Sequence, residues 1–269
     1  DHTGEPCTEI RKRRISYGAR KDSEMNPFQV LAHKYDIFNA ADIPAYVEFI
    51  RKAFEKADID VREVLDVGCG TGVITVRLAE LGYDMTGVDA SSEMLDECRR
   101  KKGSEGILLL MQDMRHMDLY GTVQAAVCTF DSLNYLSTAD DLKSVFASVS
   151  LFMEASGIFV FDVNTKYAYE NVYGDNCYVC EDGGDMLVWQ NFYSKSSRRC
   201  RFVLTLFEEK NGSYVRSDEV QTEKYFSGRT IAGALDKCGF DILGIYGSTD
   251  MTPVCDDSPK AYYICKKRG

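Results

Sequence analysis

The stretch VLDVGCGTG, residues 64–72, decides the fold of this chain. Residues 63–67 have the apolar character of a short buried strand, and a helical pattern runs from about Gly72 to Leu81. Between them lies a turn with three glycines. Glycine is needed where the backbone takes unusual dihedral angles or approaches a ligand closely, and the amides at a helix start attract polar ligand groups. The stretch therefore predicts a ligand-binding turn between a strand and a helix.

Strand-like and helix-like patterns alternate on both sides of this turn. We predict further strands at residues 83–88, 106–112, 123–130, 157–163, 240–246 and 261–266, and helices at residues 92–102, 139–154 and 228–238. A helical pattern at residues 27–57 precedes them, with Asp42 near the cap of its second helix. Strands and helices alternating at this spacing form a parallel, doubly wound sheet. The predicted fold class is therefore α/β, with a mostly parallel sheet of seven strands.

The pattern changes after Asn164. Residues 187–193, 200–208 and 213–225 alternate like antiparallel strands, and Asn211-Gly212 is a strong hairpin signal. We therefore predict a Rossmann-like domain over residues 27–166 and 226–269, interrupted by an antiparallel lid at residues 167–225 that covers the carboxyl ends of the parallel strands. Residues 1–26 lack periodicity and are interpreted as an N-terminal arm.

Charge and hydropathy limit the partners. The net charge of −10 and the isoelectric point near 4.9 argue against a nucleic-acid-binding surface, which needs clustered Lys and Arg. Arg11 to Arg14 form a basic run, interpreted as part of a solvated arm. The longest apolar run, Ile107 to Met111, is too short to cross a bilayer, and the first thirty residues contain no secretory apolar region. We expect a cytoplasmic protein without a membrane or nucleic-acid partner, as a monomer or homodimer.

Cysteine usage gives little reason to expect a metal. Cys177 and Cys180 form a single C-x-x-C, which would be half of a zinc site, among ten cysteines. The chain has no second C-x-x-C, and none of its three histidines lies close in sequence. We therefore predict no metal ligands.

An acidic residue follows the second predicted strand of the sheet. In Gly87-Val88-Asp89-Ala90-Ser91, the Asp89 carboxylate can accept two hydrogen bonds from a ribose diol, as in dinucleotide-binding proteins. The turn, however, has the spacing G-x-G-x-G, and Val73 takes the place of the last glycine of the dinucleotide fingerprint. A nucleotide-like ligand is indicated, and a nicotinamide-dependent oxidoreductase remains an alternative.

Two further segments follow later strands. Gln112-Asp113-Met114 ends the third strand, and residues 128–136, CTFDSLNYL, follow the fourth. Open α/β sheets bind ligands in the crevice at the carboxyl ends of their strands. Both segments are therefore expected at the same site as the glycine turn.

VLDVGCGTG resembles motif I of the class I (Rossmann-like) S-adenosylmethionine-dependent methyltransferases. Further stretches resemble a group of bacterial members of this class that carry an antiparallel insertion after strand five. These stretches are HKYD (33–36), FDVNTKY (161–167), VWQN (188–191), GSYVR (212–216) and YYICKK (262–267). The match spans roughly residues 28–267.

The resemblance implies S-adenosylmethionine as cofactor and S-adenosylhomocysteine as product. In the family, the glycine turn wraps the amino-acid end of the cofactor, Asp89 takes the ribose hydroxyls and Met94 packs on the adenine. Asp113 accepts from the adenine amino group, and Tyr35 reaches the cofactor's carboxylate. The implied cofactor-binding set is Tyr35, Asp66, Gly68, Cys69, Gly70, Gly72, Asp89, Ala90, Met94, Gln112, Asp113, Met114, Phe130 and Asp131.

Methyl transfer from a sulfonium makes modest demands on a protein. Acceptor and methyl must be aligned and water excluded, and a base is required only if the acceptor must first lose a proton. We name Asp131, Asn164 and Tyr167 as candidate catalytic residues. Other candidate acceptor-facing or lid residues are Asn134, Tyr173, Trp189, Phe192, Tyr193, Phe202, Tyr214 and Tyr225.

An aromatic lid and an acidic surface favour N- or O-methylation of a small organic acceptor by in-line transfer. An RNA or protein methyltransferase and a non-catalytic S-adenosylmethionine-binding protein remain alternatives, beside the oxidoreductase.

Overall fold

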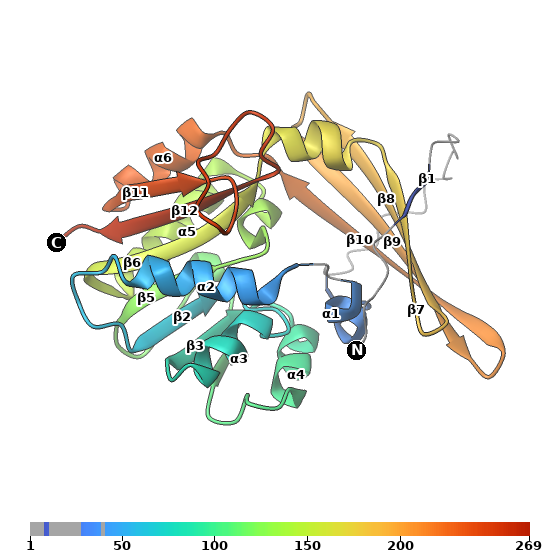
Figure 1. The fold of residues 1–269 in the computed structure, drawn as a ribbon, viewed down its shortest axis with the longest axis horizontal. Helices are drawn as coiled ribbons and strands as arrows, with labels where there is room; N and C mark the ends of the chain where they lie inside the picture. Colours follow the sequence, from blue (N-terminus) through green and yellow to red (C-terminus); the bar gives the residue numbers. More distant parts are fainter. Residues whose placement is uncertain (1–7, 11–27, 39–40) are drawn as a thin grey trace.

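The computed structural model describes residues 8–10, 28–38 and 41–269 (Figure 1). The remainder of the predicted N-terminal arm, including the basic run Arg11 to Arg14, lies outside the described residues. Among the described residues no helix is both long and apolar enough to cross a membrane. The same residues contain no group of His, Cys, Asp and Glu side chains that could hold a metal ion.

A seven-stranded sheet forms the body of the protein, and it confirms the predicted fold class. Its order is β11-β12-β6-β5-β2-β3-β4. The strands from β6 to β4 run parallel, whereas β12 is antiparallel to both of its neighbours. The strands are β2 (Glu63–Val67), β3 (Asp84–Asp89), β4 (Leu108–Met111), β5 (Val123–Cys128), β6 (Met153–Asn164), β11 (Phe240–Tyr246) and β12 (Lys260–Lys267).

Helices cover both faces of this sheet. Apolar side chains of α2 (Ile43–Phe54) and α3 (Val73–Glu80) pack in one core cluster, and those of α5 (Ala139–Leu151) and α6 (Gly228–Lys237) pack in another. Helix α4 (Ser92–Arg100) follows β3. A short polar side chain accepts a backbone N–H at four helix starts, which fixes where each helix begins; these residues are Asp42, Ser91, Thr138 and Ser227.

A second, antiparallel sheet has the order β1-β7-β8-β9-β10. Its strands are β1 (Thr8–Ile10), β7 (Cys177–Asp182), β8 (Asp185–Ser194), β9 (Arg199–Lys210) and β10 (Ser213–Lys224). The Asn211-Gly212 hairpin is confirmed: both residues have positive φ, and Ser213 pairs with Lys210. We did not predict β1, β7 or the helical turn η4 (Ala168–Tyr173) that precedes β7.

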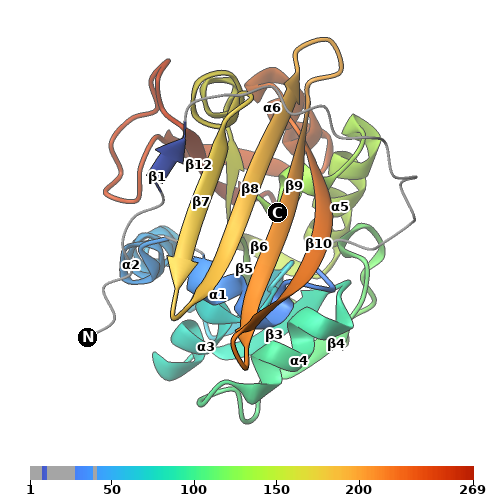
Figure 2. The same ribbon diagram turned by 90° about the vertical axis from the view of Figure 1, so that its right-hand side faces the viewer.

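The five-stranded sheet stands beyond the carboxyl ends of the parallel strands (Figures 1 and 2). Its strand β10 is joined to the short helix η3 (Ser132–Tyr135), which follows β5. Asn134 Nδ2 donates to the Lys224 carbonyl at 2.9 Å, and Tyr135 Oη donates to Gln221 at 2.9 Å. The two sheets are therefore held together at the edge where a ligand crevice is expected.

The helical pattern predicted over residues 27–57 is divided into separate helical segments, and Asp42 caps α2 as expected. The structure has a short turn η1 (Ala32–Lys34), a single turn α1 (Tyr35–Phe38) and then α2. The aromatic residues predicted to form the lid do not all lie on one side of the sheet. Because side chains alternate across a strand, Phe192 and Tyr214 are 38% and 59% exposed, whereas Trp189, Tyr193 and Phe202 pack around Tyr169.

Candidate functional site

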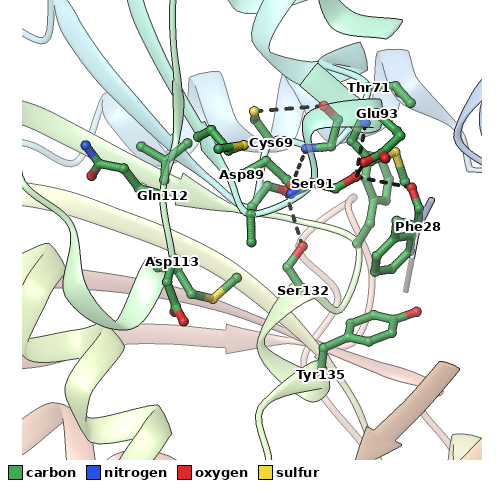
Figure 3. Close-up of a pocket in the computed structure, with 18 of the residues that line it drawn as sticks. Phe28, Cys69, Thr71, Asp89, Ser91, Glu93, Gln112, Asp113, Ser132 and Tyr135 are labelled. Carbon is green, nitrogen blue, oxygen red and sulfur yellow. Dashed lines mark hydrogen bonds between the residues drawn. The ribbon is translucent and has the colours of Figure 1, made fainter. Parts of the chain in front are cut away.

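A cavity of about 670 Å³ lies at the carboxyl ends of β2, β3 and β5 (Figure 3). Most of the predicted cofactor-binding residues line it, whereas Asp66, Gly72 and Asp131 do not. The predicted residues on the cavity wall are Tyr35, Gly68, Cys69, Gly70, Asp89, Ala90, Met94, Gln112, Asp113, Met114 and Phe130. Segments separated in sequence by up to about a hundred residues thus contribute to one surface.

The glycine turn is held by its neighbouring strand. The amides of Gly68 and Cys69 both donate to the Val88 carbonyl, at 2.7 and 3.0 Å. Gly68, Gly70 and Gly72 all have positive φ, which disfavours other residues. A Cβ on Gly70 would meet no atom within 4 Å, because this glycine faces the cavity. A Cβ on Gly72 would instead overlap Cys98 Sγ, so Gly72 allows α3 and α4 to pack closely.

Asp89 connects the end of β3 to the glycine turn. Its Oδ2 accepts the Gly70 N–H at 2.8 Å, and its Oδ1 accepts the Ser91 N–H at 2.8 Å. Burial raises the pKa of Asp89, and these amide hydrogen bonds oppose the rise. Each carboxylate oxygen can accept a second hydrogen bond, so the group can still receive two hydroxyls of a ligand.

Asp66 lies beneath the turn and not on the cavity wall. Its side chain is 1% exposed, and Thr75 Oγ1 donates to Oδ2 at 2.7 Å. Within the described part of the chain, no group donates to Oδ1. Burial raises the pKa of this carboxyl to about 7, although the Thr75 hydrogen bond lowers it. The structure therefore places Asp66 where it supports the turn from behind.

The other end of the cavity contains two side chains already occupied by local partners. Arg115 forms an ion pair with Asp113 and lowers the pKa of that carboxyl. The Gln112 amide pairs with the Asp118 backbone, donating to its carbonyl at 2.9 Å and accepting its N–H at 2.8 Å. Met94 is buried, and its N–H is capped by Ser91. At this end the available surface consists largely of apolar side chains and backbone.

Residues 28–38, here called the N-terminal strap, close one side of the cavity. The amides of Phe28, Val30 and Leu31 all donate to the buried carboxylate of Glu219 on β10, at 2.9, 3.0 and 3.2 Å. The Phe28 ring packs edge-on against Tyr135 with a centroid separation of 5.0 Å.

The strap is also fastened to the seven-stranded domain. Ser91 Oγ donates to the Phe28 carbonyl at 3.2 Å, and Asp36 accepts hydrogen bonds from Thr71 and Lys101. The strap therefore bridges the two sheets. Phe28 and Glu219 were not predicted, and Tyr135 was expected at the site only as part of residues 128–136, because their roles depend on this long-range contact.

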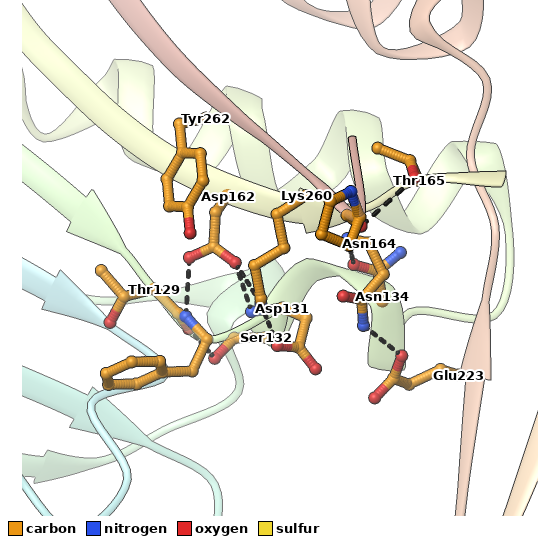
Figure 4. Close-up of polar contacts among 12 residues, drawn as sticks. Thr129, Asp131, Ser132, Asn134, Asp162, Asn164, Thr165, Glu223, Lys260 and Tyr262 are labelled. Atoms are coloured by element: carbon orange, nitrogen blue, oxygen red, sulfur yellow. Dashed lines mark hydrogen bonds and ion pairs between the residues drawn. The ribbon is translucent and has the colours of Figure 1, made fainter. Parts of the chain in front are cut away.

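A buried ion-pair network lies beside the cavity (Figure 4). The Asp162 carboxylate accepts the Phe130 N–H at 2.7 Å and the Asp131 N–H at 3.0 Å. Lys260 Nζ on β12 lies 2.7 Å from Asp162 and 2.5 Å from Asp131. Phe130 and Asp131 both have positive φ, near 53° and 54°. Asp162 and Lys260 thus fix the turn after β5, on whose cavity side Phe130 lies.

Asn164, a predicted catalytic residue, joins this network to β10. Its N–H donates to Asn134 Oδ1 at 2.9 Å, and its Nδ2 donates to Glu223 Oε2 at 2.9 Å. The same Glu223 oxygen accepts the Tyr169 hydroxyl at 2.7 Å. We call Asp131, Asp162, Glu223 and Lys260 the carboxyl cluster. No local pattern singled out Glu223 or Lys260, because each lies far from Asp131 in sequence and reaches it only through the fold.

Tyr167, the third predicted catalytic residue, does not line the cavity. Its hydroxyl makes no hydrogen bond with any described residue, whereas Tyr169, two residues later, is fully buried and donates to Glu223. The wide helical turn η4 directs the two tyrosines differently. Of this pair, Tyr169 is the one that the structure brings to the carboxyl cluster.

The cavity and the carboxyl cluster are neighbours. Tyr35 and Tyr135 both line the cavity. Burial raises the pKa of each tyrosine, and the charges of Asp131 and Glu223 raise both further. Each hydroxyl therefore lies within electrostatic reach of both carboxyl groups.

Comparisons with known proteins agree with this geometry. Residues 64–157 match the family described as "Methyltransferase domain". The chain is 32% identical over 206 residues to "Putative methyltransferase YqeM" of Bacillus subtilis (strain 168), covering 76% of this chain and 83% of that protein.

Solved structures of methyltransferases also resemble this chain. A crystal structure of an S-adenosylmethionine-dependent methyltransferase from Clostridium acetobutylicum ATCC 824 matches with a TM-score of 0.81 and 27% identity, covering 90% of this chain and 99% of that one. The sugar N-methyltransferase KedS8 from Streptoalloteichus sp. ATCC 53650 shares the fold, with a TM-score of 0.74, 20% identity and coverage of 97% and 100%.

Proposed function

The chain belongs to the S-adenosylmethionine-dependent methyltransferases, and from this premise we propose that it methylates a small organic acceptor, held where the two sheets meet. Membership of this family sets aside the nicotinamide-dependent oxidoreductase that the glycine turn and Asp89 had left open. The acceptor class is our inference from the form and charge of the site.

The cavity fits the cofactor that the family uses. Its volume of about 670 Å³ is within the range of pockets that bury a drug-sized ligand. Gly70 leaves the turn open to a closely approaching group, and the Asp89 carboxylate keeps free acceptor positions for a diol. We assign the ribose to Asp89 and the amino-acid end to the turn of Gly68 and Gly70. When bound, the cofactor supplies a methyl group already activated by a sulfonium.

The protein's contribution is placement and exclusion of water. The Gly68–Gly70 turn and Asp89 are joined by a hydrogen bond, so they present a preformed surface to one reactant. The strap and Tyr135 close the opposite wall and limit the water that reaches the reacting atoms. Asp131 and Asn164 lie on the side where the five-stranded sheet joins, and we place the acceptor there.

The proposal depends mainly on the wall of the cavity that is held by β10. Phe28 and Tyr135 are tied to β10 by hydrogen bonds through Glu219 and Gln221, so a second sheet restricts the space next to the cofactor. A small acceptor suits such a space better than a folded RNA or protein. The net charge of −10 also disfavours an RNA acceptor. KedS8, which shares the fold, is described as a sugar N-methyltransferase.

We also propose how the chain is divided and where it acts. Residues 27–166 and 226–269 would form the methyltransferase domain, and residues 167–225 the acceptor-side insertion. The protein would act in the cytoplasm as a monomer or homodimer, and size-exclusion chromatography with light scattering determines which of these it is.

Methyl-labelled S-adenosylmethionine tests the acceptor class. The purified protein is incubated with cell extract that has been separated into small-molecule, RNA and protein fractions. We expect label to enter the small-molecule fraction, and Asp89→Ala to reduce this incorporation. Label in RNA or protein alone would contradict the proposal. Binding of S-adenosylhomocysteine without label in any fraction would favour a non-catalytic binding protein.

A further inference from the structure

Glu223 is an unusual residue for the interior of a strand. In β10, the polar side chains of Glu219, Gln221 and Glu223 are buried, whereas Val220 between them is 39% exposed. The strand thus turns its polar face inward, the reverse of the usual arrangement of a half-buried strand. Glu219 binds the strap amides and Gln221 accepts from Tyr135. Glu223 alone among these three has an oxygen with no donor.

That oxygen is Oε1 of Glu223. The side chain is 2% exposed, and its two hydrogen-bond donors, Tyr169 and Asn164, both donate to Oε2. In the described part of the chain no N–H group or hydroxyl donates to Oε1, and the Asp131 carboxyl group lies within hydrogen-bonding reach of Glu223. Oε1 is not one of the enclosed polar atoms without a partner, so it keeps surface that a donor can reach. Two ionised carboxylates cannot donate to each other, so a proton or a ligand donor is expected between them. Figure 4 shows the Asp131 carboxyl group facing Glu223.

The carboxyl cluster also has fewer positively charged groups than carboxyl groups. Lys260 is the single cation among its three carboxyl groups, and it pairs with Asp131 and Asp162. The groups that face Glu223 are Asp131 before η3, Asn164 on β6 and Tyr169 on η4, with Tyr35 and Tyr135 from the cavity wall. Burial and the Asp131 charge raise the pKa of Glu223 well above its ordinary range. A proton or a second cation would therefore stabilise this arrangement.

The cluster retains accessible surface and borders the cavity. The side chains of Asp131 and Lys260 are 18% and 22% exposed, although Asp162 beside them is only 1% exposed. Tyr35 and Tyr135 line the cavity, and the charges of Asp131 and Glu223 raise the pKa of both tyrosines. The turn of Phe130 and Asp131 is therefore the common boundary of the cavity and the cluster, and we place the entry of the acceptor's amino group there.

We propose that Asp131 and Glu223 bind a primary or secondary amino group of the methyl acceptor, and that Glu223 Oε1 accepts a proton from it. This inference rests on the function proposed above and narrows it to N-methylation. An ammonium brings a second positive charge and further N–H donors to the cluster.

The proton step balances without any further reactant. A protonated amine, R–NH3⁺, gives one proton to the Glu223 carboxylate and leaves R–NH2 and a neutral carboxylic acid. The freed lone pair on nitrogen is then the nucleophile. A carboxylate with a raised pKa is a better match to an ammonium than an ordinary one. An alcohol carries no charge for the pair to recognise and holds its proton far more tightly, so the same site disfavours O-methylation.

The direct test observes Glu223 itself. The full-length protein, saturated with S-adenosylhomocysteine, is labelled with ¹³C at the glutamate carboxyl groups, and the Glu223 resonance is assigned with Glu223→Gln. Methylammonium chloride is the probe, because it is the smallest primary ammonium with a carbon substituent, and sodium chloride at equal ionic strength is the control. We expect methylammonium to move the Glu223 resonance and lower its titration midpoint, and sodium to do neither. An unmoved resonance would overturn the proposal.

A second arm tests the acceptor without knowing its identity. The small-molecule fraction of cell extract is treated with acetic anhydride in water, which blocks primary and secondary amines, before incubation with labelled S-adenosylmethionine. We expect acetylation to remove the incorporation. We also expect Glu223→Gln to lower it roughly 10- to 100-fold, the scale of one lost charged hydrogen bond, with unchanged affinity for S-adenosylhomocysteine. Incorporation that survives acetylation would overturn the amine proposal while leaving small-molecule methylation intact.

The matched control is Glu181→Gln, which changes an exposed carboxylate of β7 in the same sheet and should alter neither readout. Asp131→Asn provides an independent variant, and it should weaken the methylammonium response without abolishing cofactor binding. If the wild-type protein does not bind S-adenosylhomocysteine, that result contradicts the proposed cofactor site instead. The two proposals can therefore fail separately.

Discussion

Asp89 Oδ2 accepts the backbone N–H of Gly70 at 2.8 Å, so the carboxylate that ends β3 is fixed against the turn that follows β2. The same carboxylate accepts the Ser91 N–H at the start of α4. One side chain thus sets the distance between the two places that we assign to the ribose and to the amino-acid end of the cofactor. This relationship sets the geometry of the site before a ligand arrives.

Replacing this carboxylate should weaken cofactor binding. We expect Asp89→Ala to reduce the affinity for S-adenosylhomocysteine by roughly 1–3 kcal/mol, since charged hydrogen bonds to ligand and turn are lost. Isothermal titration calorimetry measures the change. Asp84→Ala, at the exposed opposite end of β3, should leave the affinity unchanged. Equal affinities for wild type and Asp89→Ala would remove Asp89 from the site.

Gly72 should matter for packing more than for the ligand. Gly72→Ala places a Cβ against Cys98 Sγ at a positive φ, and we expect it to lower the free energy of unfolding by about 2–4 kcal/mol. Chemical denaturation measures this. Gly82→Ala, where φ is also positive but the Cβ would meet no atom within 4 Å, reports the backbone component alone. Adding Cys98→Ala should restore part of the loss, and a strictly additive double variant would contradict the packing account.

The strand–turn–helix unit at residues 63–80 could be predicted from the sequence because its signals are local. The predicted strand at residues 63–67 is confirmed without change, and the helix begins one residue later than expected. Cys69, Gly70 and Asp89 lie on the cavity wall for the same reason: each lies at the end of a strand that the sequence pattern identifies or in the turn that follows it. Sequence periodicity therefore located one half of the cavity.

The other half depends on contacts that no local pattern encodes. Glu219 and Glu223 alternate with Val220 and Thr222, a pattern that ordinarily places the charged residues in solvent. The burial of Glu219 follows from its contact with the strap, 188 to 191 residues away in sequence, and Glu223 is enclosed by its contacts with Asn164 and Tyr169, 59 and 54 residues away. The one available signal of a buried polar face was the alternation of Glu219, Gln221 and Glu223 with Val220 and Thr222. Without the fold, it could not be distinguished from a solvated strand face.

The strap should be released when Glu219 loses its charge. Glu219→Gln can accept fewer hydrogen bonds from the amides of Phe28, Val30 and Leu31. We expect a loss of about 1–3 kcal/mol in stability, faster amide hydrogen exchange at residues 28–31 and weaker binding of S-adenosylhomocysteine. Hydrogen exchange with mass spectrometry follows the strap directly. Unchanged exchange in the variant would show that Glu219 does not hold it.

Asp66 should make stability fall as the pH rises. Its pKa is about 7 in the fold, because of burial, and near 3.9 in an unfolded chain. Between these values the folded protein holds a proton that the unfolded chain has lost, so Asp66 contributes a decrease of up to about 1.4 kcal/mol per pH unit. Asp66→Asn should remove this contribution while keeping the Thr75 hydrogen bond. Denaturation from pH 4 to pH 8 compares the two slopes, and identical slopes would contradict the assignment.

Lys260 should be more important for stability than a surface lysine of the same strand. Lys260→Met leaves the Asp162 carboxylate, which is 1% exposed, without its cation, and we expect a loss of about 3–5 kcal/mol. Lys266→Met breaks a pair with the exposed Asp58 and should cost about 0–1 kcal/mol. Thermal and chemical denaturation measure both. Similar losses in the two variants would show that the carboxyl cluster tolerates the missing cation.

A crystal structure of the protein with S-adenosylhomocysteine tests the central claim most directly. We expect the ligand in the cavity, with both ribose hydroxyls on Asp89, the amino-acid end at the Gly68–Gly70 turn and the sulfur directed toward the side where Asp131 and Glu223 lie. A ligand bound elsewhere, or a ribose that makes no contact with Asp89, would contradict the account.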